Sequence, residues 1–342
     1  MSQPTANGTD DLKKVLYYEI LSFQPGNIEL LKSSFDFRSL PNPDCDTPEE
    51  LKRIDAVFAP LGYFWGREKI DWAPNLKVIA SNTTGTPHID TEYAEKRGIR
   101  VISLKDQADF LKSITPTAEL TWGLILSLVR RIPWAFDSVC RGNWNRRLFG
   151  SKKMLSNMTL GIVGMGRLGE MVARCGVSFG MKIQYFTLNE KSPDIPQLIR
   201  VPTLEELVAT SDIVTLHIPL EERNEKLFDK RIFSLFKEGA YLINTSRGEI
   251  IDSEALLDYL KVGRLAGAAL DVMEGEFERD FPSRLKHHHL IEYAINHDNL
   301  LITPHIGGST LDAWQLTEEY AIKAVLEVLA EQPLLAGKSN PK

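Results

Sequence analysis

The sequence predicts an α/β protein with two doubly wound domains, in which helices cover parallel β-sheets. Three observations lead to this fold class. Short apolar runs alternate with helical stretches along the chain, a rhythm typical of βα units. A second series of alternating apolar runs and helical stretches begins near residue 159, with longer spacing between the apolar runs, which indicates a second sheet. The length of 342 residues also suits two domains of ordinary size.

The first hundred residues are expected to form one small α/β unit. Apolar runs predict strands at residues 14–20, 56–60, 76–81 and 99–103. A helix is expected over residues 90–97, where Gly98 stops it. The preceding residues 1–11 are polar, with no basic start and no apolar core, so we do not expect a signal peptide.

Two longer helices are expected before and after the second sheet. The first runs from about residue 116 to residue 131 and is apolar nearly all round, as in a helix buried between domains. Pro133 is expected to limit it. The last covers about residues 310–331, with an apolar stripe that includes Leu311, Trp314 and Val325.

The second sheet is expected to contain six strands. They are predicted at residues 159–163, 182–187, 213–218, 240–244, 266–272 and 300–303. Helical segments fill most of the gaps, and Thr203 with Glu206 forms a capping box that opens one of them. Six parallel strands with helices on both faces form the layout that binds dinucleotides.

The composition excludes several classes of protein. Hydrophobic residues make up 43% of the chain and charged residues 25%, which argues against a disordered protein or a fibre. The net charge of −6 gives no global attraction to nucleic acid. The three cysteines match no zinc pattern and suit a reduced, cytoplasmic compartment. The most apolar run, residues 118–129, is too short to span a membrane.

Gly164, Gly166 and Gly169 form a G-x-G-x-x-G motif between a predicted strand and a helical pattern. The first glycine permits a tight turn, the second lets the backbone approach a pyrophosphate, and the third lets helix and strand pack closely. The pyrophosphate then accepts hydrogen bonds from N–H groups at the helix N-terminus. The neighbouring strands favour this interpretation over a glycine-rich turn without a ligand.

The choice of cofactor depends on the end of the second strand of this domain. An Asp or Glu is expected there to bind the adenosine ribose, but the sequence has Thr187. Thr187 can hydrogen-bond a ribose and does not repel a 2′-phosphate. Glu190 is a further candidate for the ribose, and Lys191 for a phosphate. No Arg follows Thr187 directly, so we expect NAD, with NADP as the open alternative.

Three polar groups follow later strands of the same sheet. Arg247 lies in Asn244-Thr-Ser-Arg-Gly, Asp271 to Glu276 follow the next strand, and His305 follows the last. Ligands bind at this carboxyl edge of a parallel sheet. An Arg can hold a carboxylate, a His can carry a proton near neutral pH, and an acid can orient the imidazole. The trio therefore predicts acid–base chemistry beside a nicotinamide.

These motifs resemble those of the D-isomer-specific 2-hydroxyacid dehydrogenase family, which includes phosphoglycerate dehydrogenases and glyoxylate/hydroxypyruvate reductases. The resemblance covers about residues 76–316. It depends on the glycine loop and on the stretches Leu216-His-Ile-Pro-Leu, Asn244-Thr-Ser-Arg-Gly-Glu-Ile-Ile-Asp, Ala268-Ala-Leu-Asp-Val and Ile302-Thr-Pro-His-Ile-Gly-Gly.

The resemblance implies a Rossmann dinucleotide-binding domain, residues 115–308, inserted into a smaller flavodoxin-like substrate domain, residues 12–114 and 309–342. It implies catalytic roles for Arg247, Glu276 and His305. Cofactor contacts are expected at Gly164, Gly166, Arg167, Leu168, Gly169, Thr187, Ile218, Pro219, Thr245, Ser246, Asp271, His305 and Gly308. The substrate carboxylate is expected on the N–H groups of Thr84 and Gly85 and on Arg247.

The implied reaction is hydride transfer between a nicotinamide and C2 of a D-2-hydroxy or 2-keto acid. His305 would be the acid/base, Glu276 its partner and Arg247 the substrate anchor. The resemblance also implies a homodimer, and no metal, nucleic-acid or membrane partner is expected. Phe277 stands where the family usually has Pro, and the stretch to residue 299 is longer than usual, so the substrate stays open. The alternatives are a related dehydrogenase of another small anion and a non-catalytic NAD(H)-sensing protein like the corepressors.

Overall fold

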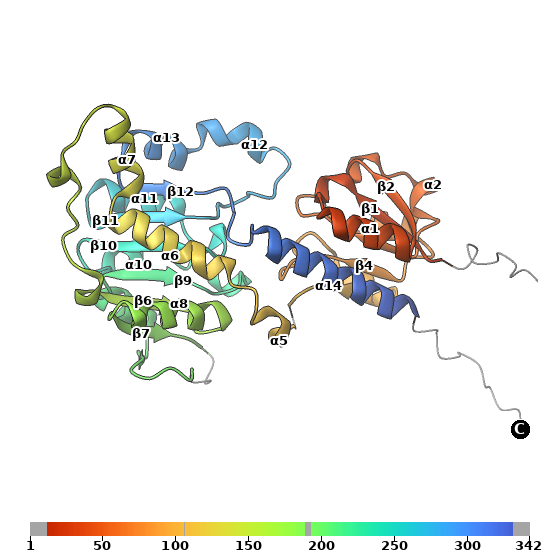
Figure 1. Cartoon of the computed structure of the whole chain (residues 1–342), viewed down its shortest axis with the longest axis horizontal. Helices are drawn as coiled ribbons and strands as arrows, with labels where there is room; N and C mark the ends of the chain where they lie inside the picture. Colours follow the sequence, from red (N-terminus) through yellow and green to blue (C-terminus); the bar gives the residue numbers. More distant parts are fainter. Residues whose placement is uncertain (1–11, 106, 189–192, 331–342) are drawn as a thin grey trace, which may run out of the picture. The chain divides into compact units, whose positions relative to one another are not determined.

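The structure, a computed structural model, describes residues 12–105, 107–188 and 193–330. The chain forms two compact units, each with one sheet (Figure 1). Of the described residues, the smaller unit contains those from Leu12 to Leu111 and from Thr310 to Ala330, and the larger unit contains those between Lys112 and Ser309. All described strand pairs are parallel, so the expected α/β class with two doubly wound sheets is confirmed.

The smaller unit has a five-stranded sheet in the order β2-β1-β3-β4-β5, which is the flavodoxin-like order. Its strands are β1 Lys14–Tyr18, β2 Asp36–Leu40, β3 Ala56–Phe58, β4 Val78–Ala80 and β5 Arg100–Ile102. The sequence analysis missed β2, because this edge strand is mostly exposed and polar and therefore carries no apolar run. The predicted strand 14–20 was too long, since Glu19–Leu21 forms a 3₁₀ turn.

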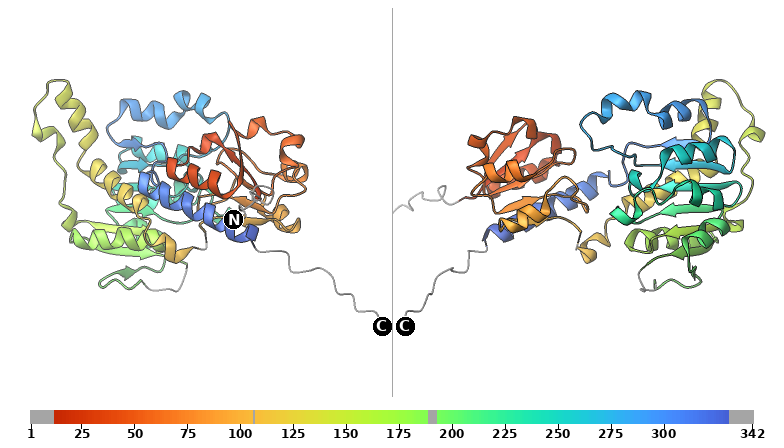
Figure 2. Two further views of the ribbon diagram at one scale, coloured as in Figure 1. Left: turned by 45° about the vertical axis from the view of Figure 1, so that its right-hand side comes forward. Right: turned by 180° about the vertical axis from the view of Figure 1, so that it is seen from behind.

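Helices cover both faces of this sheet. They are α1 Pro25–Ser34, α2 Pro48–Leu51, α3 Arg67–Trp72, α4 Thr91–Lys96 and α14 Leu311–Ala330. A further short helix, α5 Ala108–Leu111, follows β5, and its Phe110 stacks on Tyr320 of α14. The last helix packs on α1 and on the sheet, where Ala321, Ile322 and Val325 are fully buried (Figure 2). Its buried Glu318 accepts hydrogen bonds from the Gln24 N–H at 2.7 Å and from the Asn27 amide at 2.9 Å. The end of the described chain thus returns to its beginning, and the larger unit is an insertion.

The larger unit has a seven-stranded sheet in the order β12-β11-β10-β9-β6-β7-β8. The strands are β6 Thr159–Val163, β7 Lys182–Phe186, β8 Ile199–Arg200, β9 Ile213–Leu216, β10 Ala240–Asn244, β11 Leu265–Leu270 and β12 Leu300–Ile302. Six were predicted, and the missed strand is β8. It has only two residues, both exposed, too few to show a pattern. Counted from β6, the order is that of the doubly wound dinucleotide-binding fold with one further strand.

Two apolar cores lie on the two faces of this sheet. On one face α6 Pro116–Val129 and α8 Arg167–Ser178 pack together, with Trp122, Ile125 and Val172 in the core. The other face is covered by α9 Leu204–Thr210, α10 Lys230–Leu235, α11 Ser253–Lys261 and α13 His289–Asn296. As predicted, Thr203 caps α9 by accepting a hydrogen bond from the Glu206 N–H at 3.1 Å.

Pro133 does not limit the helical region as the sequence suggested. The helix α6 ends at Val129, and α7 Ile132–Cys140 begins at once after Arg131, whose φ of 54° turns the chain. Pro133 lies in the first turn of α7, where its missing N–H costs no helical hydrogen bond. A short α12, Phe281–Arg284, lies in the stretch between Phe277 and residue 299. Within the described ranges, no helix is long and apolar enough to cross a membrane.

Candidate active site

The glycine loop joins β6 to α8, and each of its three glycines has a different structural reason. Gly164 has a φ of 92°, and a Cβ on it would lie 2.5 Å from the His217 main-chain oxygen. A Cβ on Gly169 would lie 2.2 Å from the Gly164 oxygen, so no other residue lets the helix pack this closely. A Cβ on Gly166 would meet nothing within 4 Å. The fold therefore requires the first and third glycines, whereas the second faces open space.

The N-terminus of α8 is built to receive an anion. Gly166 is its N-cap and supplies no side-chain hydrogen bond to the first N–H groups of the helix. These groups carry the positive end of the helix dipole, which attracts phosphate. The next two residues, Arg167 and Leu168, are half-buried, and Arg167 donates to the Ile114 oxygen at 2.6 Å. The open space at Gly166 and the uncapped helix end fit the pyrophosphate of a dinucleotide.

The strands on either side of β6 bring further predicted contacts toward this loop. Ile218 and Pro219 follow β9, and the Ile218 side chain would lie 2.6 Å from a Cβ on Gly164. Thr187 follows β7 on the other side and is half-buried. Its main-chain oxygen accepts a hydrogen bond from Arg200 Nη2 at 3.2 Å. The alternative ribose contact Glu190 and the phosphate contact Lys191 lie outside the described residues.

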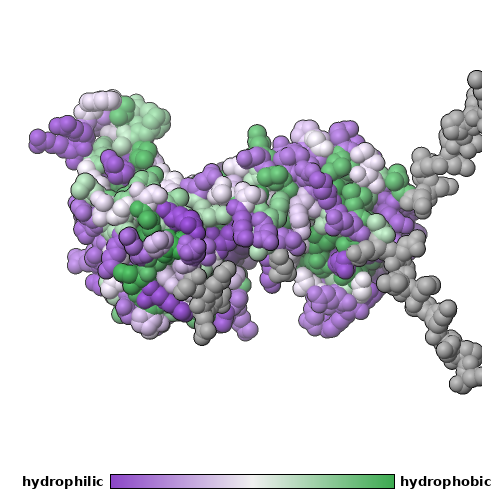
Figure 3. Space-filling model, turned by 60° about the horizontal axis from the view of Figure 1, so that its bottom comes forward, coloured by the Kyte–Doolittle hydropathy of each residue, from purple (hydrophilic) through white to green (hydrophobic). Residues whose placement is uncertain are grey.

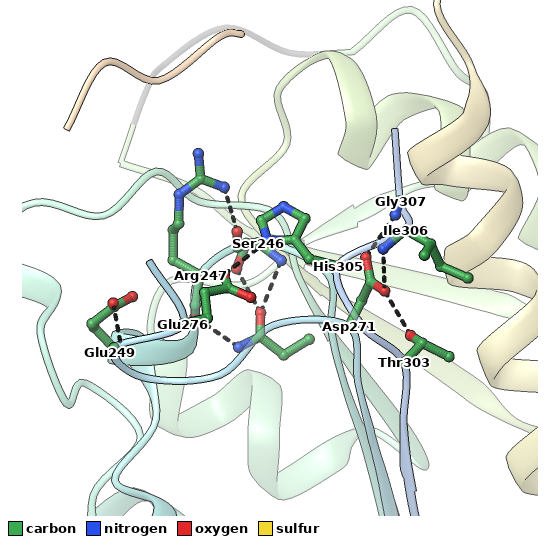
Figure 4. A network of polar contacts seen from close by, with 11 residues as sticks. Ser246, Arg247, Glu249, Asp271, Glu276, Thr303, His305, Ile306 and Gly307 are labelled. Carbon is green, nitrogen blue, oxygen red and sulfur yellow. Dashed lines mark hydrogen bonds and ion pairs between the residues drawn. The ribbon is translucent and has the colours of Figure 1, made fainter. Parts of the chain in front are cut away.

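Arg247 lies in a turn after β10 that the buried Asn244 holds. The Asn244 amide donates to the Arg247 oxygen at 2.8 Å, and its oxygen accepts from the Ser246 N–H at 3.0 Å and the Ser246 hydroxyl at 2.7 Å. Arg247 Nη1 donates to the Ser246 oxygen at 2.6 Å (Figure 4). Thr245 is buried, and its hydroxyl lies 2.9 Å from that of Thr121 on α6. These bonds fix the direction in which the guanidinium leaves the strand.

His305 and Glu276 form a direct pair. His305 Nδ1 lies 2.8 Å from Glu276 Oε1, and the two side chains point toward each other (Figure 4). The carboxylate is 12% exposed and the imidazole 34%, so a small ligand can reach the ring while the acid is mostly covered. The Phe277 ring lies 5.5 Å from the imidazole, centroid to centroid. A carboxylate bonded to Nδ1 orients the ring and leaves Nε2 to exchange a proton.

Asp271 does not pair with His305 but holds the loop that carries it. This carboxylate is buried, and it accepts hydrogen bonds from the Thr303 hydroxyl at 2.6 Å, the Ile306 N–H at 2.9 Å and the Gly307 N–H at 2.7 Å. The loop needs such support because His305 has a φ of 51°, in the left-handed region. Of the two acids that follow β11 in the sequence, Asp271 and Glu276, only Glu276 bonds to the imidazole. Gly308, also a predicted cofactor contact, is exposed in this loop.

The turn with Arg247 and the loop with Glu276 lie against each other. A Cβ on Gly248 would lie 2.1 Å from the Met273 carbonyl carbon, so the two backbones are in direct contact. Glu249 Oε1 accepts a hydrogen bond from the Gly275 N–H at 3.3 Å. Sequence reasoning missed these positioning roles of Gly248 and Glu249. The sequence indicates only that they lie beside Arg247, and this does not show that they contact the loop that carries Glu276.

The predicted carboxylate-binding residues belong to the smaller unit. Thr84 and Gly85 lie in the loop after β4, where the Thr83 hydroxyl donates to the Gly85 oxygen at 2.6 Å. His88 follows in the same loop and is buried, with Nε2 3.2 Å from the Ala59 oxygen. Burial lowers the pKa of His88 to about 4, so this imidazole is neutral at physiological pH.

Two other histidines, His217 and His288, have structural surroundings. His217 is half-buried next to Gly164, with Nε2 3.0 Å from the Thr215 hydroxyl, and desolvation of its imidazole lowers its pKa to about 4. His288 caps α13 by accepting a hydrogen bond from the Leu290 N–H. Across the part of the chain that the structure describes, no three His, Cys, Asp or Glu side chains are grouped to hold a metal ion.

Comparison with known proteins extends these observations. Residues 122–307 match the model of the family described as D-isomer specific 2-hydroxyacid dehydrogenase, NAD binding domain. A glyoxylate reductase from Thermofilum pendens is 37% identical over 302 residues, which cover 85% of this chain and 84% of that enzyme. A D-3-phosphoglycerate dehydrogenase from Methanocaldococcus jannaschii is 34% identical over 83% of this chain but only 50% of its own length.

Solved structures have the same fold. A D-lactate dehydrogenase from Aquifex aeolicus, complexed with NAD and lactic acid, aligns with a TM-score of 0.79. The alignment covers 92% of this chain and 95% of that one, at 27% sequence identity.

Proposed function

Because the chain belongs to the D-isomer-specific 2-hydroxyacid dehydrogenase family, we propose that it transfers hydride between a nicotinamide and C2 of a D-2-hydroxy or 2-keto acid. The observation that carries the proposal is the pair of His305 and Glu276, 2.8 Å apart at the same sheet edge as the glycine loop and Arg247. An acid/base, a cation and a dinucleotide loop at one edge are what this reaction requires.

The protein's own groups would act on the substrate oxygen and carboxylate. In the reducing direction His305 Nε2 donates a proton to the carbonyl oxygen, and in the oxidising direction it takes the hydroxyl proton. Glu276, bonded to Nδ1, orients the ring and stabilises its protonated form. Arg247 attracts the substrate carboxylate and polarises the carbonyl. The bound nicotinamide supplies or accepts the hydride.

The residues of the glycine loop would hold the cofactor. The N–H groups at the start of α8 bind its pyrophosphate, with Gly166 leaving room for the approach. Arg167, Leu168, Ile218, Pro219, Thr245, Ser246, Asp271 and Gly308 are the other proposed contacts in the larger unit. The matching family model describes an NAD-binding domain, and NAD is the proposed cofactor, with NADP as the alternative.

Thr84 and Gly85 are proposed to bind the substrate carboxylate through their main-chain N–H groups. Proline at Thr84 removes one donor, so we expect Thr84→Pro to raise KM for the keto acid more than it lowers kcat. Thr86→Ala, two residues along the same loop, is the matched control. An unchanged KM in Thr84→Pro would assign the carboxylate to other groups.

The test of the proposed function is turnover of a panel of 2-keto acids with NADH and with NADPH. The panel includes glyoxylate, hydroxypyruvate, pyruvate and a branched 2-keto acid, and it is repeated with His305→Ala. We expect reduction of at least one member and loss of most of the rate in the variant. Tight binding of NADH without turnover of any member would instead support a non-catalytic nucleotide-sensing protein.

We further propose a homodimer formed through the segment from α7 to residue 154. The structure gives α7 no buried residue, and Phe136, Trp144 and Met154 are 69%, 88% and 68% exposed. Apolar and hydrophilic residues lie side by side on the projecting part of the larger unit that contains this segment (Figure 3). Large apolar side chains that are this exposed along one segment are typical of a protein–protein interface.

Sedimentation analysis tests this assembly. We expect a dimer for the unmodified chain and a monomer for Phe136→Glu. Ile295→Glu changes a similarly exposed apolar residue elsewhere in the same unit and should leave the dimer intact. A dimer that persists in Phe136→Glu would place the interface on another surface.

A further inference from the structure

Two hydroxyl groups hold the loop that is proposed to bind the substrate carboxylate. The Thr83 hydroxyl donates a hydrogen bond to the Gly85 main-chain oxygen at 2.6 Å. The Ser81 hydroxyl lies 2.7 Å from that of Thr83. A threonine hydroxyl has a single proton, and Thr83 gives it to Gly85, so Ser81 is the donor in the second bond. The two side chains therefore form a relay of hydrogen bonds from Ser81 through Thr83 to the Gly85 carbonyl.

The relay begins at a well-fixed part of the smaller unit. Ser81 directly follows β4 and is 2% exposed, and its N–H donates to the Ile102 oxygen of β5 at 2.9 Å. The Thr83 main-chain oxygen accepts a hydrogen bond from the Leu104 N–H, also at 2.9 Å. In a planar trans peptide the C=O and the following N–H point in opposite directions. The bond from Leu104 thus turns the Thr84 N–H away from the end of β5.

The Thr83 hydroxyl also fixes a second peptide, the one between Gly85 and Thr86. Glycine has the widest choice of backbone angles, so without this bond the peptide would turn at little cost. A turned peptide could point the Gly85 carbonyl oxygen at the substrate carboxylate, and the two would repel each other because both carry negative charge. The bond from Thr83 satisfies this oxygen within the loop and fixes its direction.

We infer that Thr83 is a positioning residue for the substrate carboxylate, and that Ser81 aligns the Thr83 hydroxyl. Thr83 fixes the peptides on both sides of the one between Thr84 and Gly85, one through its own carbonyl and the other through its hydroxyl. It acts through the N–H donors of Thr84 and Gly85 and not by touching the substrate. The inference rests on the proposed function, because it requires the substrate carboxylate to bind this loop.

The test measures substrate binding apart from turnover. Oxamate is an analogue of pyruvate that hydride transfer does not reduce, and NADH fluorescence measures its binding to the NADH-bound chain. Thr83→Val keeps the shape of the side chain and removes the hydroxyl. We expect oxamate to bind about three- to tenfold more weakly, as for the loss of one neutral hydrogen bond. KM for the keto acid should rise by the same factor, with kcat changed less than about twofold. NADH affinity should be unchanged, because the proposed cofactor site lies in the larger unit.

Three further variants separate the relay from other effects. Thr86→Val makes the same change in the same loop but outside the relay, and should leave oxamate affinity unchanged. Thr83→Ser restores the hydroxyl and should recover most of the affinity. In Thr83→Val the buried Ser81 hydroxyl loses its acceptor, so the double variant Ser81→Ala/Thr83→Val removes this unpaired donor as well. We expect the double variant to bind oxamate as weakly as Thr83→Val, because the Gly85 peptide is free in both.

The outcomes separate this inference from the proposed function. An unmodified chain that binds NADH but neither binds oxamate nor reduces a keto acid would overturn the proposed function, and the inference with it. Unchanged oxamate affinity and KM in Thr83→Val, or an equal loss in Thr86→Val, would overturn the inference alone. Full recovery in the double variant would do the same, because the loss would then come from the unpaired Ser81. A loss confined to the variants without the Thr83 hydroxyl, with melting temperatures preserved, supports the inference.

Discussion

Replacing Gly166 by Asp should separate folding from cofactor binding. Gly166 is the N-cap of α8, with φ −91° and ψ −163°, an extended conformation that any residue adopts. A Cβ there meets nothing within 4 Å, so the first atom of a side chain has open space. Asp is also a preferred N-cap, and its charge is favourable at a helix N-terminus. The variant should therefore fold at least as stably as the unmodified chain.

The same carboxylate faces the position proposed for the pyrophosphate. Two unit charges about 4 Å apart repel each other by about 4 kcal/mol at an effective dielectric constant of about 20. That energy corresponds to a loss of roughly three orders of magnitude in affinity. The expected gain in helix stability is only a few tenths of a kcal/mol, since glycine is itself a tolerated N-cap. The two effects therefore differ in sign as well as in size.

Urea unfolding and NADH fluorescence titration measure the two effects. Gly123→Asp is the control, because the exposed Gly123 of α6 also has open space around its Cβ position and the charge change is identical. It should leave NADH affinity unchanged. Gly169→Ala gives the opposite pattern, a large loss of stability, because its Cβ would lie 2.2 Å from the Gly164 oxygen. If Gly166→Asp bound NADH with unchanged affinity, the glycine loop would not be the cofactor site.

Three further predictions concern acid stability, the catalytic pair and the contact between two loops. Burial lowers the pKa of His88 and His217 to about 4, so the unfolded chain binds more protons as pH falls from 6.5 toward 4. The contribution of these histidines to the free energy of unfolding is therefore fully present above pH 6.5. It decreases as pH falls below 6.5, by up to about 3 kcal/mol per histidine. Equal urea midpoints at about pH 7 and about pH 5 would contradict this prediction. Glu276→Gln removes the charge beside His305, so reductive kcat should fall on the order of tenfold or more while NADH affinity holds, and Glu274→Gln is its matched control. Gly248→Ala should lower the melting temperature and kcat together, because its Cβ would lie 2.1 Å from the loop after β11 and would push that loop away. An unchanged melting temperature would show that the loop moves aside without cost.

The sequence by itself determined the fold class and most of the elements. Buried strands such as β6 and β10 are short apolar runs, and the glycine loop between β6 and α8 follows from backbone geometry that only glycine permits. The side chains beyond strand ends, Arg247, Glu276 and His305, could also be placed at one edge. The carboxyl ends of parallel strands in a doubly wound sheet meet there whatever their register.

The tertiary structure decided which of these groups meet. Asp271 and Glu276 both follow β11, and the sequence does not show which of them meets the imidazole. In the structure Glu276 bonds to Nδ1 of His305. Asp271 instead accepts hydrogen bonds from the N–H groups of Ile306 and Gly307. The tertiary structure also supplied β8, a strand too short and too exposed to show any pattern in the sequence. Periodicity reports only which side of an element faces the core. A hydrogen bond between residues far apart in the chain depends on strand pairing and loop path, which the whole fold sets.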